Sequence, residues 1–100
     1  MSFIKKYKII EDNITYDVCE YINGTTVWYF NEKIHRENAP AIEHADGTKK
    51  WYKNGLIHRE DGPATEYCVG RPGYWYNGKY LSNINTDEEL KKYIKLLSIS

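Results

Sequence analysis

Long apolar runs are missing from this chain of 100 residues, and cysteine and histidine are scarce. No segment approaches the roughly 20 apolar residues that a membrane-spanning helix needs. The N-terminal stretch MSFIKKYKII has an apolar run too short for a secretory signal peptide. These absences predict a cytoplasmic protein with no membrane partner.

The few cysteines and histidines lack the spacing of a metal site. Cys19 and Cys68 form no CxxC pattern, and no pair among His35, His44 and His58 has ligand spacing. No glycine-rich loop opens a helix, so the sequence has no phosphate-cradling fingerprint. We therefore expect no metal and no cofactor. Free thiols are favoured, and a structural disulfide is the alternative.

The chain also has no excess of positive or of negative charge. Lys plus Arg and Asp plus Glu both number 14, which gives a net charge of zero. A general binder of extended nucleic acid would carry a basic excess, and a headgroup-binding protein would carry basic clusters. A local pocket for a small anion remains compatible with this balance.

A tandem repeat is what the chain does contain. Residues 20–42 align without a gap on residues 43–65, and 12 of the 23 positions are identical. A degenerate third unit, 66–81, gains a residue before Trp75 and lacks the HRE triplet of the other two. Terminal repeats are commonly atypical because they cap a stack. We expect a single domain, 1–100, with a lead-in hairpin over 1–19, these three repeats and a C-terminal helix over 86–98.

Turn signals in each unit predict β-hairpins. Asn23-Gly24 and Asp46-Gly47 favour two-residue type I′ turns, whose central residues both need positive φ. Asn54-Gly55 and Asn77-Gly78 mark a second turn per unit. The predicted fold is therefore mainly β, an antiparallel meander of repeated β-hairpins.

Adjacent Trp and Tyr residues recur in the units. Trp28 and Tyr29 are neighbours on a predicted strand, so their side chains point to opposite faces. Stacked units would form a Trp ladder on one face and a Tyr ladder on the other. One ladder is expected in the core, and the other needs cover from the chain ends or a partner. An open sheet with such a face predicts a homodimer or a higher symmetric assembly.

The C-terminal stretch NTDEELKKYIKLLSIS has helical signals. Thr86 is the expected N-cap, Glu89 completes a capping box, and Leu90, Ile94 and Leu97 recur at helical spacing. The amphipathic helix is expected to lie over the sheet or over a second copy of the protein.

The stretch WYKNGLIHREDGPA, from Trp51 to Ala64, resembles the MORN-type repeat. More closely, it is similar to the divergent HREDGPA-type tandem repeats of phage and large-virus proteins. The resemblance covers Glu20 to about Leu81. The first unit departs from it, since Glu32 replaces the turn glycine and Asn38-Ala39 replaces Asp-Gly, which predicts looser turns. The resemblance implies an elongated antiparallel sheet used for protein contacts and dimerisation, and no enzymatic activity.

The HRE triplets, at residues 35–37 and 58–60, group a histidine, an arginine and a carboxylate as a catalytic site does. Catalysis needs one set of groups with pKa values pushed apart, whereas this set occurs twice in equivalent places. Repetition favours an architectural role, with ligand binding as the alternative.

Residues that break the repeat symmetry are the best candidates for a ligand site. Arg71, in the inserted loop 70–73, has no counterpart in the earlier units. Arginine can fork onto a phosphate, and aromatic rings can stack on a base. The predicted ligand-binding residues are Arg71, Tyr74, Trp75, Arg59, Trp51 and His58.

The resulting hypothesis is a non-enzymatic binding module, encoded by a phage or virus. It would act against host defence by sequestering a small phosphorylated, nucleotide-type immune signal in the host cytoplasm. The alternative is a protein–protein interaction adaptor that blocks or scaffolds a host protein.

Overall fold

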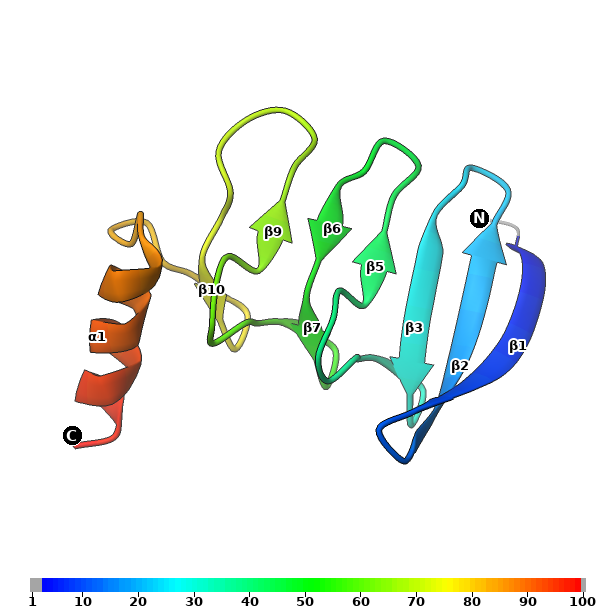
Figure 1. The fold of residues 1–100 in the computed structure, drawn as a ribbon, viewed down its shortest axis with the longest axis horizontal. Coiled ribbons are helices and arrows are strands. Elements are labelled where there is room, and N and C mark those ends of the chain that lie inside the picture. The colour runs from blue at the N-terminus through cyan, green and yellow to red at the C-terminus, as the bar shows by residue number, and fades with distance from the viewer. Residues whose placement is uncertain (1–2, 100) are drawn as a thin grey trace.

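The chain folds into a row of antiparallel strands that ends in one helix (Figure 1). The computed structural model describes residues 3–99, and Met1, Ser2 and Ser100 of the predicted domain lie outside them. The elements are β1 (Phe3–Glu11), β2 (Ile14–Tyr21), β3 (Thr26–Phe30), β4 (Lys33–Ile34), β5 (Ile42–Glu43), β6 (Lys49–Lys50), β7 (Tyr52–Lys53), β8 (Leu56–Ile57), β9 (Thr65–Glu66), β10 (Trp75–Tyr76), β11 (Lys79–Tyr80) and α1 (Asp87–Leu97). The mainly-β class with a single C-terminal helix is confirmed.

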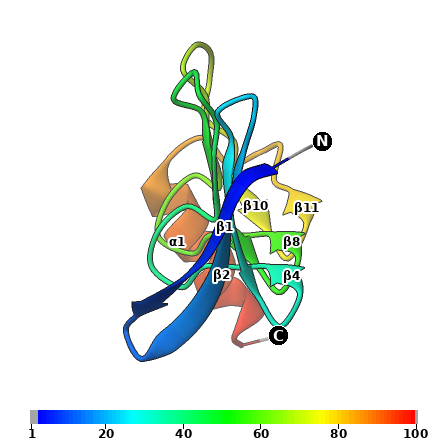
Figure 2. The same cartoon turned by 90° about the vertical axis from the view of Figure 1, so that its right-hand side faces the viewer.

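One sheet runs through most of the row. Its strand order is β1-β2-β3-β5-β6-β9, with β4 also paired to β3. The ribbons β7–β8 and β10–β11 are separate two-stranded sheets, one in the second repeat and one in the third. The molecule measures 43 × 32 × 19 Å, and Figure 2 looks along the row from the β1 end. The shared sheet therefore runs through the first two repeats and ends at β9, on the boundary with the third, and the later two repeats each add a small ribbon.

The second turn predicted for each unit forms at Asn54-Gly55 and Asn77-Gly78, and its geometry is type I′. Both central residues are left-handed, with φ of 52° and 82° in the first turn and 48° and 82° in the second. The first repeat adopts the same geometry at Asn31 and Glu32, with φ of 51° and 65°. The looser turn expected at Glu32 is therefore wrong: the strand pairing imposes the conformation although glutamate is costly there.

The type I′ turns expected at Asn23-Gly24 and Asp46-Gly47 are also wrong. Only the glycines have positive φ, 87° and 93°. The Tyr21 N–H donates to Thr25 O at 2.8 Å, so the first loop contains three residues and the second repeats it. In both loops the Asn or Asp side chain accepts the N–H two residues on, at 3.0 and 2.8 Å. This Asx contact suits a type I turn followed by a left-handed glycine.

The core consists of two clusters rather than two ladders. Trp28 is buried with Tyr16 and Val18, and Tyr52 packs against the same cluster. Trp and Tyr residues of successive repeats thus meet, which contradicts the predicted separation onto opposite faces. The reason is that Trp51 lies between β6 and β7, where the chain leaves the shared sheet, so strand alternation is interrupted.

The helix α1 closes the end of the row instead of lying over a sheet face (Figure 1). Leu90 packs with Tyr74 and Leu81 in the second cluster. Thr86 is the N-cap, as predicted, and its Oγ1 accepts the Glu89 N–H at 3.2 Å. The helix therefore covers the last repeat, as a cap does.

The cysteines are not paired with each other. Cys19 is buried and Cys68 is exposed, and both are free thiols. Among residues 3–99, no helix has the length and apolar character needed to cross a bilayer.

Candidate functional site

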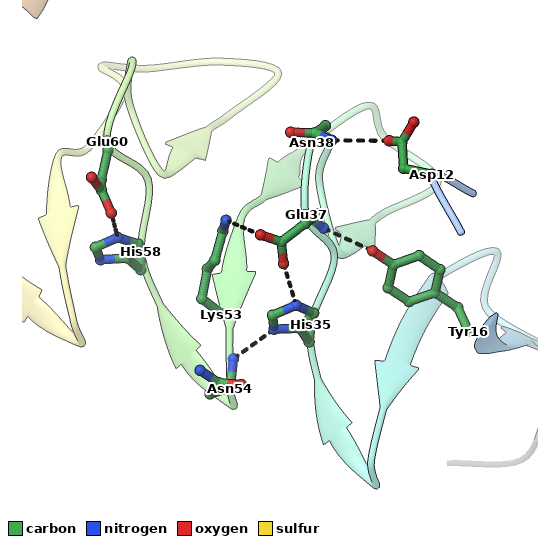
Figure 3. A network of polar contacts seen from close by, with 9 residues as sticks. All are labelled: Asp12, Tyr16, His35, Glu37, Asn38, Lys53, Asn54, His58 and Glu60. Carbon is green, nitrogen blue, oxygen red and sulfur yellow. Dashed lines mark hydrogen bonds and ion pairs between the residues drawn. The ribbon is translucent and has the colours of Figure 1, made fainter. Parts of the chain in front are cut away.

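The histidine of each HRE triplet links its repeat to the next one. His35 Nδ1 accepts the Asn54 N–H at 2.9 Å, and His58 Nδ1 accepts the Asn77 N–H at 2.8 Å. An accepting Nδ1 carries no hydrogen, so the hydrogen is on Nε2. Nε2 donates to the glutamate of the same triplet, at 2.6 Å for Glu37 and 2.9 Å for Glu60 (Figure 3).

The arginine of each triplet covers the tryptophan of its own repeat. The Arg36 guanidinium carbon lies 3.5 Å from the Trp28 ring centre, and that of Arg59 lies 4.0 Å from the Trp51 ring centre. Each guanidinium also donates to the carbonyl of the proline four residues on, at 3.2 and 3.1 Å. These contacts hold the loop that follows each triplet against the sheet.

Charges around the two triplets differ. Arg36 forks onto the Glu11 carboxylate at 3.0 and 2.8 Å, which lowers the pKa of Glu11. Lys53 donates to Glu37 at 3.0 Å, and this bond, with that from His35, lowers the pKa of Glu37. In the second triplet the side chain that accepts from Arg59 is the exposed Asp61, at 2.8 Å. The first triplet is thus fixed more firmly than the second.

The third repeat lacks an HRE triplet, and the helix α1 follows it. The helix supplies the contacts instead. The Tyr74 hydroxyl donates to Asp87 at 2.7 Å, and burial together with this bond raises the pKa of Tyr74 to about 12. The HRE groups are therefore bonded within the fold as connectors between repeats, the arrangement an architectural role requires.

A hollow of about 560 Å³ lies between the HRE loops, and we call it the inter-repeat hollow. Three of the predicted site residues, Trp51, His58 and Arg59, line it. The lining also includes three carboxylates, those of Glu37, Glu60 and Asp61. Its two cations are Lys53 and Arg59. This surplus of carboxylates disfavours an anionic ligand.

A second hollow, of about 370 Å³, lies in the third repeat, and we call it the third-repeat hollow. Its lining contains one charged side chain, that of Arg71, and no carboxylate; the residues are Thr65, Tyr67, Arg71, Pro72, Gly73, Trp75, Tyr80, Ile84 and Asn85. Arg71 Nη2 donates to Asn85 Oδ1 at 2.5 Å. Among residues 3–99 no arginine lies over the Trp75 ring, unlike the two earlier tryptophans.

The structure divides the six predicted ligand-binding residues among three places. Arg71 and Trp75 share the third-repeat hollow, whereas Trp51, His58 and Arg59 line the inter-repeat hollow. Tyr74 lines neither, because it is 5% exposed and packs against Leu81 and Leu90. Arg59 does not line the hollow that contains Arg71, since its guanidinium is held on the Trp51 ring.

Sequence reasoning missed Thr65 and Gly73 in the third-repeat hollow. A signal for them existed, since Gly73 stands two 23-residue steps after Val27 and one step after Lys50. The loss of a side chain at that register is a break of symmetry as clear as the gain of Arg71.

No three His, Cys, Asp or Glu side chains within residues 3–99 converge in the manner of metal ligands. No protein-family model, curated protein or solved structure matches the chain. The resemblance to MORN-type repeats therefore stays a prediction from the motif.

Proposed function

We propose that the chain is a non-enzymatic binding module that holds a small phosphorylated, nucleotide-type molecule in the third-repeat hollow. The observation that carries the proposal is the placement of Arg71 beside Trp75 in a hollow with no carboxylate in its lining. A guanidinium can fork onto two phosphate oxygens, and an indole ring can stack on a base. The volume of about 370 Å³ falls within the usual range for small-ligand sites.

Binding rather than catalysis is supported by the state of the HRE groups. His58 is bonded at both ring nitrogens, and Arg59 is stacked, hydrogen-bonded and paired with Asp61. Groups committed in this way have no free lone pair or proton for general acid–base work.

The proposed biological role is sequestration of a host immune signal by a phage or viral protein in the host cytoplasm. It is supported by the motif resemblance to HREDGPA-type repeats of phage and large-virus proteins. A sequestering protein needs affinity and no turnover, which suits a hollow lined by one cation and several aromatic rings.

A thermal-stability screen against nucleotides, cyclic dinucleotides and ADP-ribose-type molecules tests the proposal. A ligand that binds only the folded chain raises the melting temperature. Arg71→Ala should abolish most of that rise, and Arg71→Lys should restore only part of it, because lysine cannot fork onto two oxygens. Lys92→Ala is the control, since Lys92 is exposed on α1 outside the hollow. A rise that survives Arg71→Ala unchanged contradicts the proposed site.

The adaptor function is the second candidate, and exposed apolar side chains favour it. Leu96 and Ile99, at the end of α1, are 63% and 77% exposed. A host protein that docks there would be lost from pull-downs with Leu96→Glu but retained with Arg71→Ala. The sequestration proposal predicts the opposite pattern for the ligand.

A further inference from the structure

Two buried polar atoms in the third-repeat hollow have no hydrogen-bond partner. They are Thr65 Oγ1 and Trp75 Nε1, and among residues 3–99 no other buried side-chain nitrogen or oxygen shares this condition. Thr65 is 2% exposed, and both residues line the hollow. Buried polar groups are nearly always bonded, so an unbonded pair in a hollow indicates a missing partner.

Both atoms approach one point beside Gly73. A Cβ built on Gly73 would lie 2.5 Å from Thr65 Oγ1 and 3.0 Å from Trp75 Nε1. Gly73 does not have positive φ, so the backbone does not demand glycine here. At this register no side chain of residue 73 stands between the two polar atoms.

The repeat shows that this opening is particular to the third unit. Thr65 pairs with Lys50 on one side and with Gly73 on the other. Ile42, one repeat earlier, pairs with Val27 and Lys50 in the same way. Ile42 stands at the place of Thr65 and has no hydroxyl, and Lys50 stands at the place of Gly73, so the earlier junction has neither the polar pair nor the missing side chain. The junction of the second and third repeats therefore has two changes at one place, a hydroxyl gained at Thr65 and a side chain lost at Gly73.

The chemistry of the pair selects the atom that it can bind. The indole Nε1–H only donates, and the threonine hydroxyl can donate as well. Two donors aimed at one point need an acceptor with two lone pairs, such as a carbonyl oxygen. A ring nitrogen has one lone pair, and an exocyclic amino group is a donor. Phosphate oxygens also qualify, but Arg71 is the better partner for them in the same hollow.

We propose that Thr65 and Trp75 form a specificity subsite for the ring carbonyl oxygen of an oxo-substituted nucleobase, while Arg71 holds the phosphate. This inference rests on the proposed function and specifies its ligand class. The third-repeat hollow would thereby distinguish oxo from amino bases, because an amino group cannot accept from the Trp75 Nε1–H and would leave that donor unpaired.

Calorimetric titration with inosine 5′-monophosphate and adenosine 5′-monophosphate tests the subsite, because the two share sugar and phosphate and differ only at C6, oxo or amino, and in the hydrogen on the adjacent N1. The wild-type chain should bind the inosine nucleotide about tenfold or more tightly. Thr65→Val keeps the side-chain shape and should bring the two affinities close together. Thr65→Ser retains the hydroxyl and should keep the preference. Melting temperatures confirm that the variants are folded.

The outcomes separate the two proposals. Arg71→Ala should weaken both nucleotides and leave their ratio unchanged. Equal wild-type affinities overturn the subsite and leave the proposed function standing. If neither nucleotide binds, the free bases hypoxanthine and adenine decide: preferential binding of hypoxanthine supports the subsite without phosphate recognition, and no binding overturns both. A crystal structure of the inosine complex gives a further test of the subsite. An ordered water between Thr65 and Trp75, in place of the base oxygen, would overturn the subsite.

Discussion

His58 of the second repeat accepts a hydrogen bond from the backbone N–H of Asn77 in the third, with 2.8 Å between Nδ1 and the amide nitrogen. The identical relationship joins His35 to Asn54 one repeat earlier. The HRE histidine thus connects successive repeats, because its Nδ1 accepts a backbone N–H from the next repeat.

Replacing this connector should destabilise the chain. His58→Ala leaves the Asn77 N–H without its acceptor, and we expect a loss of about 1–2 kcal/mol in the free energy of unfolding. His58→Asn should recover part of the loss, because its side-chain oxygen can replace Nδ1. Urea denaturation measures both. Wild-type stability in His58→Ala would exclude the architectural role.

The two equivalent arginines should differ in their contribution. Arg36 is 14% exposed and forks onto Glu11, whereas Arg59 pairs with Asp61, which is 85% exposed. We expect Arg36→Ala to cost about 2 kcal/mol and Arg59→Ala about 1 kcal/mol, since exposed pairs contribute little. Urea denaturation of the two variants measures which loss of unfolding free energy is larger. A larger loss for Arg59→Ala would show that the ion pairs do not determine the difference between the two arginines.

Acid should weaken the fold through Glu11. Its pKa lies below the ordinary value of 4.5, because the bond from Arg36 stabilises the carboxylate in the folded chain. The stabilisation is therefore complete above the unfolded pKa and is lost as pH falls through the lower folded pKa. Between about pH 5 and pH 3 the wild type should lose more stability than Glu11→Gln. Equal losses in the two proteins would contradict the Glu11–Arg36 account.

Self-association is expected at the ends of the row. β1 pairs with β2 on one side only, and Leu96 and Ile99 are exposed beside the helix C-terminus. Light scattering at micromolar concentration should give at least twice the chain mass of 11.8 kDa. Leu96→Glu should lower the measured mass if the helix forms the contact. Ile22→Glu, in a distant loop, is the control and should leave the mass unchanged. A monomer mass for the wild type would refute the prediction.

Local chemistry explains which parts of the fold were predictable. Asn54-Gly55 forms its turn because both residues tolerate positive φ, and Thr86 caps the helix because its hydroxyl can accept a free N–H. Asn23-Gly24 was ambiguous, since the same dipeptide fits a three-residue loop in which only glycine is left-handed. Strand pairing decides between the two-residue turn and the three-residue loop. That pairing involves residues distant in the sequence, so the dipeptide alone cannot indicate it.

The candidate site was only partly predictable for a related reason. Arg71 was visible as an insertion in the repeat, and it does line a hollow with Trp75. Tyr74 is adjacent in sequence, yet its ring packs against Leu81 and Leu90 in the core and its hydroxyl bonds to Asp87 of α1. The bond from the Asn77 backbone to His58 has no side-chain signature at Asn77, so no motif could reveal it.

Calorimetric titration of the wild type and Arg71→Ala with cyclic dinucleotides and ADP-ribose-type molecules tests the central claim most directly. The account predicts that a ligand of this class binds the wild type with a Kd below about 10 μM. Arg71→Ala should weaken that binding by roughly 1.5–3 kcal/mol, about ten- to a hundredfold, through loss of the charge-assisted fork onto phosphate. If no such molecule binds the wild type below about 10 μM, or Arg71→Ala binds it equally well, the third-repeat hollow is not a phosphate-binding site.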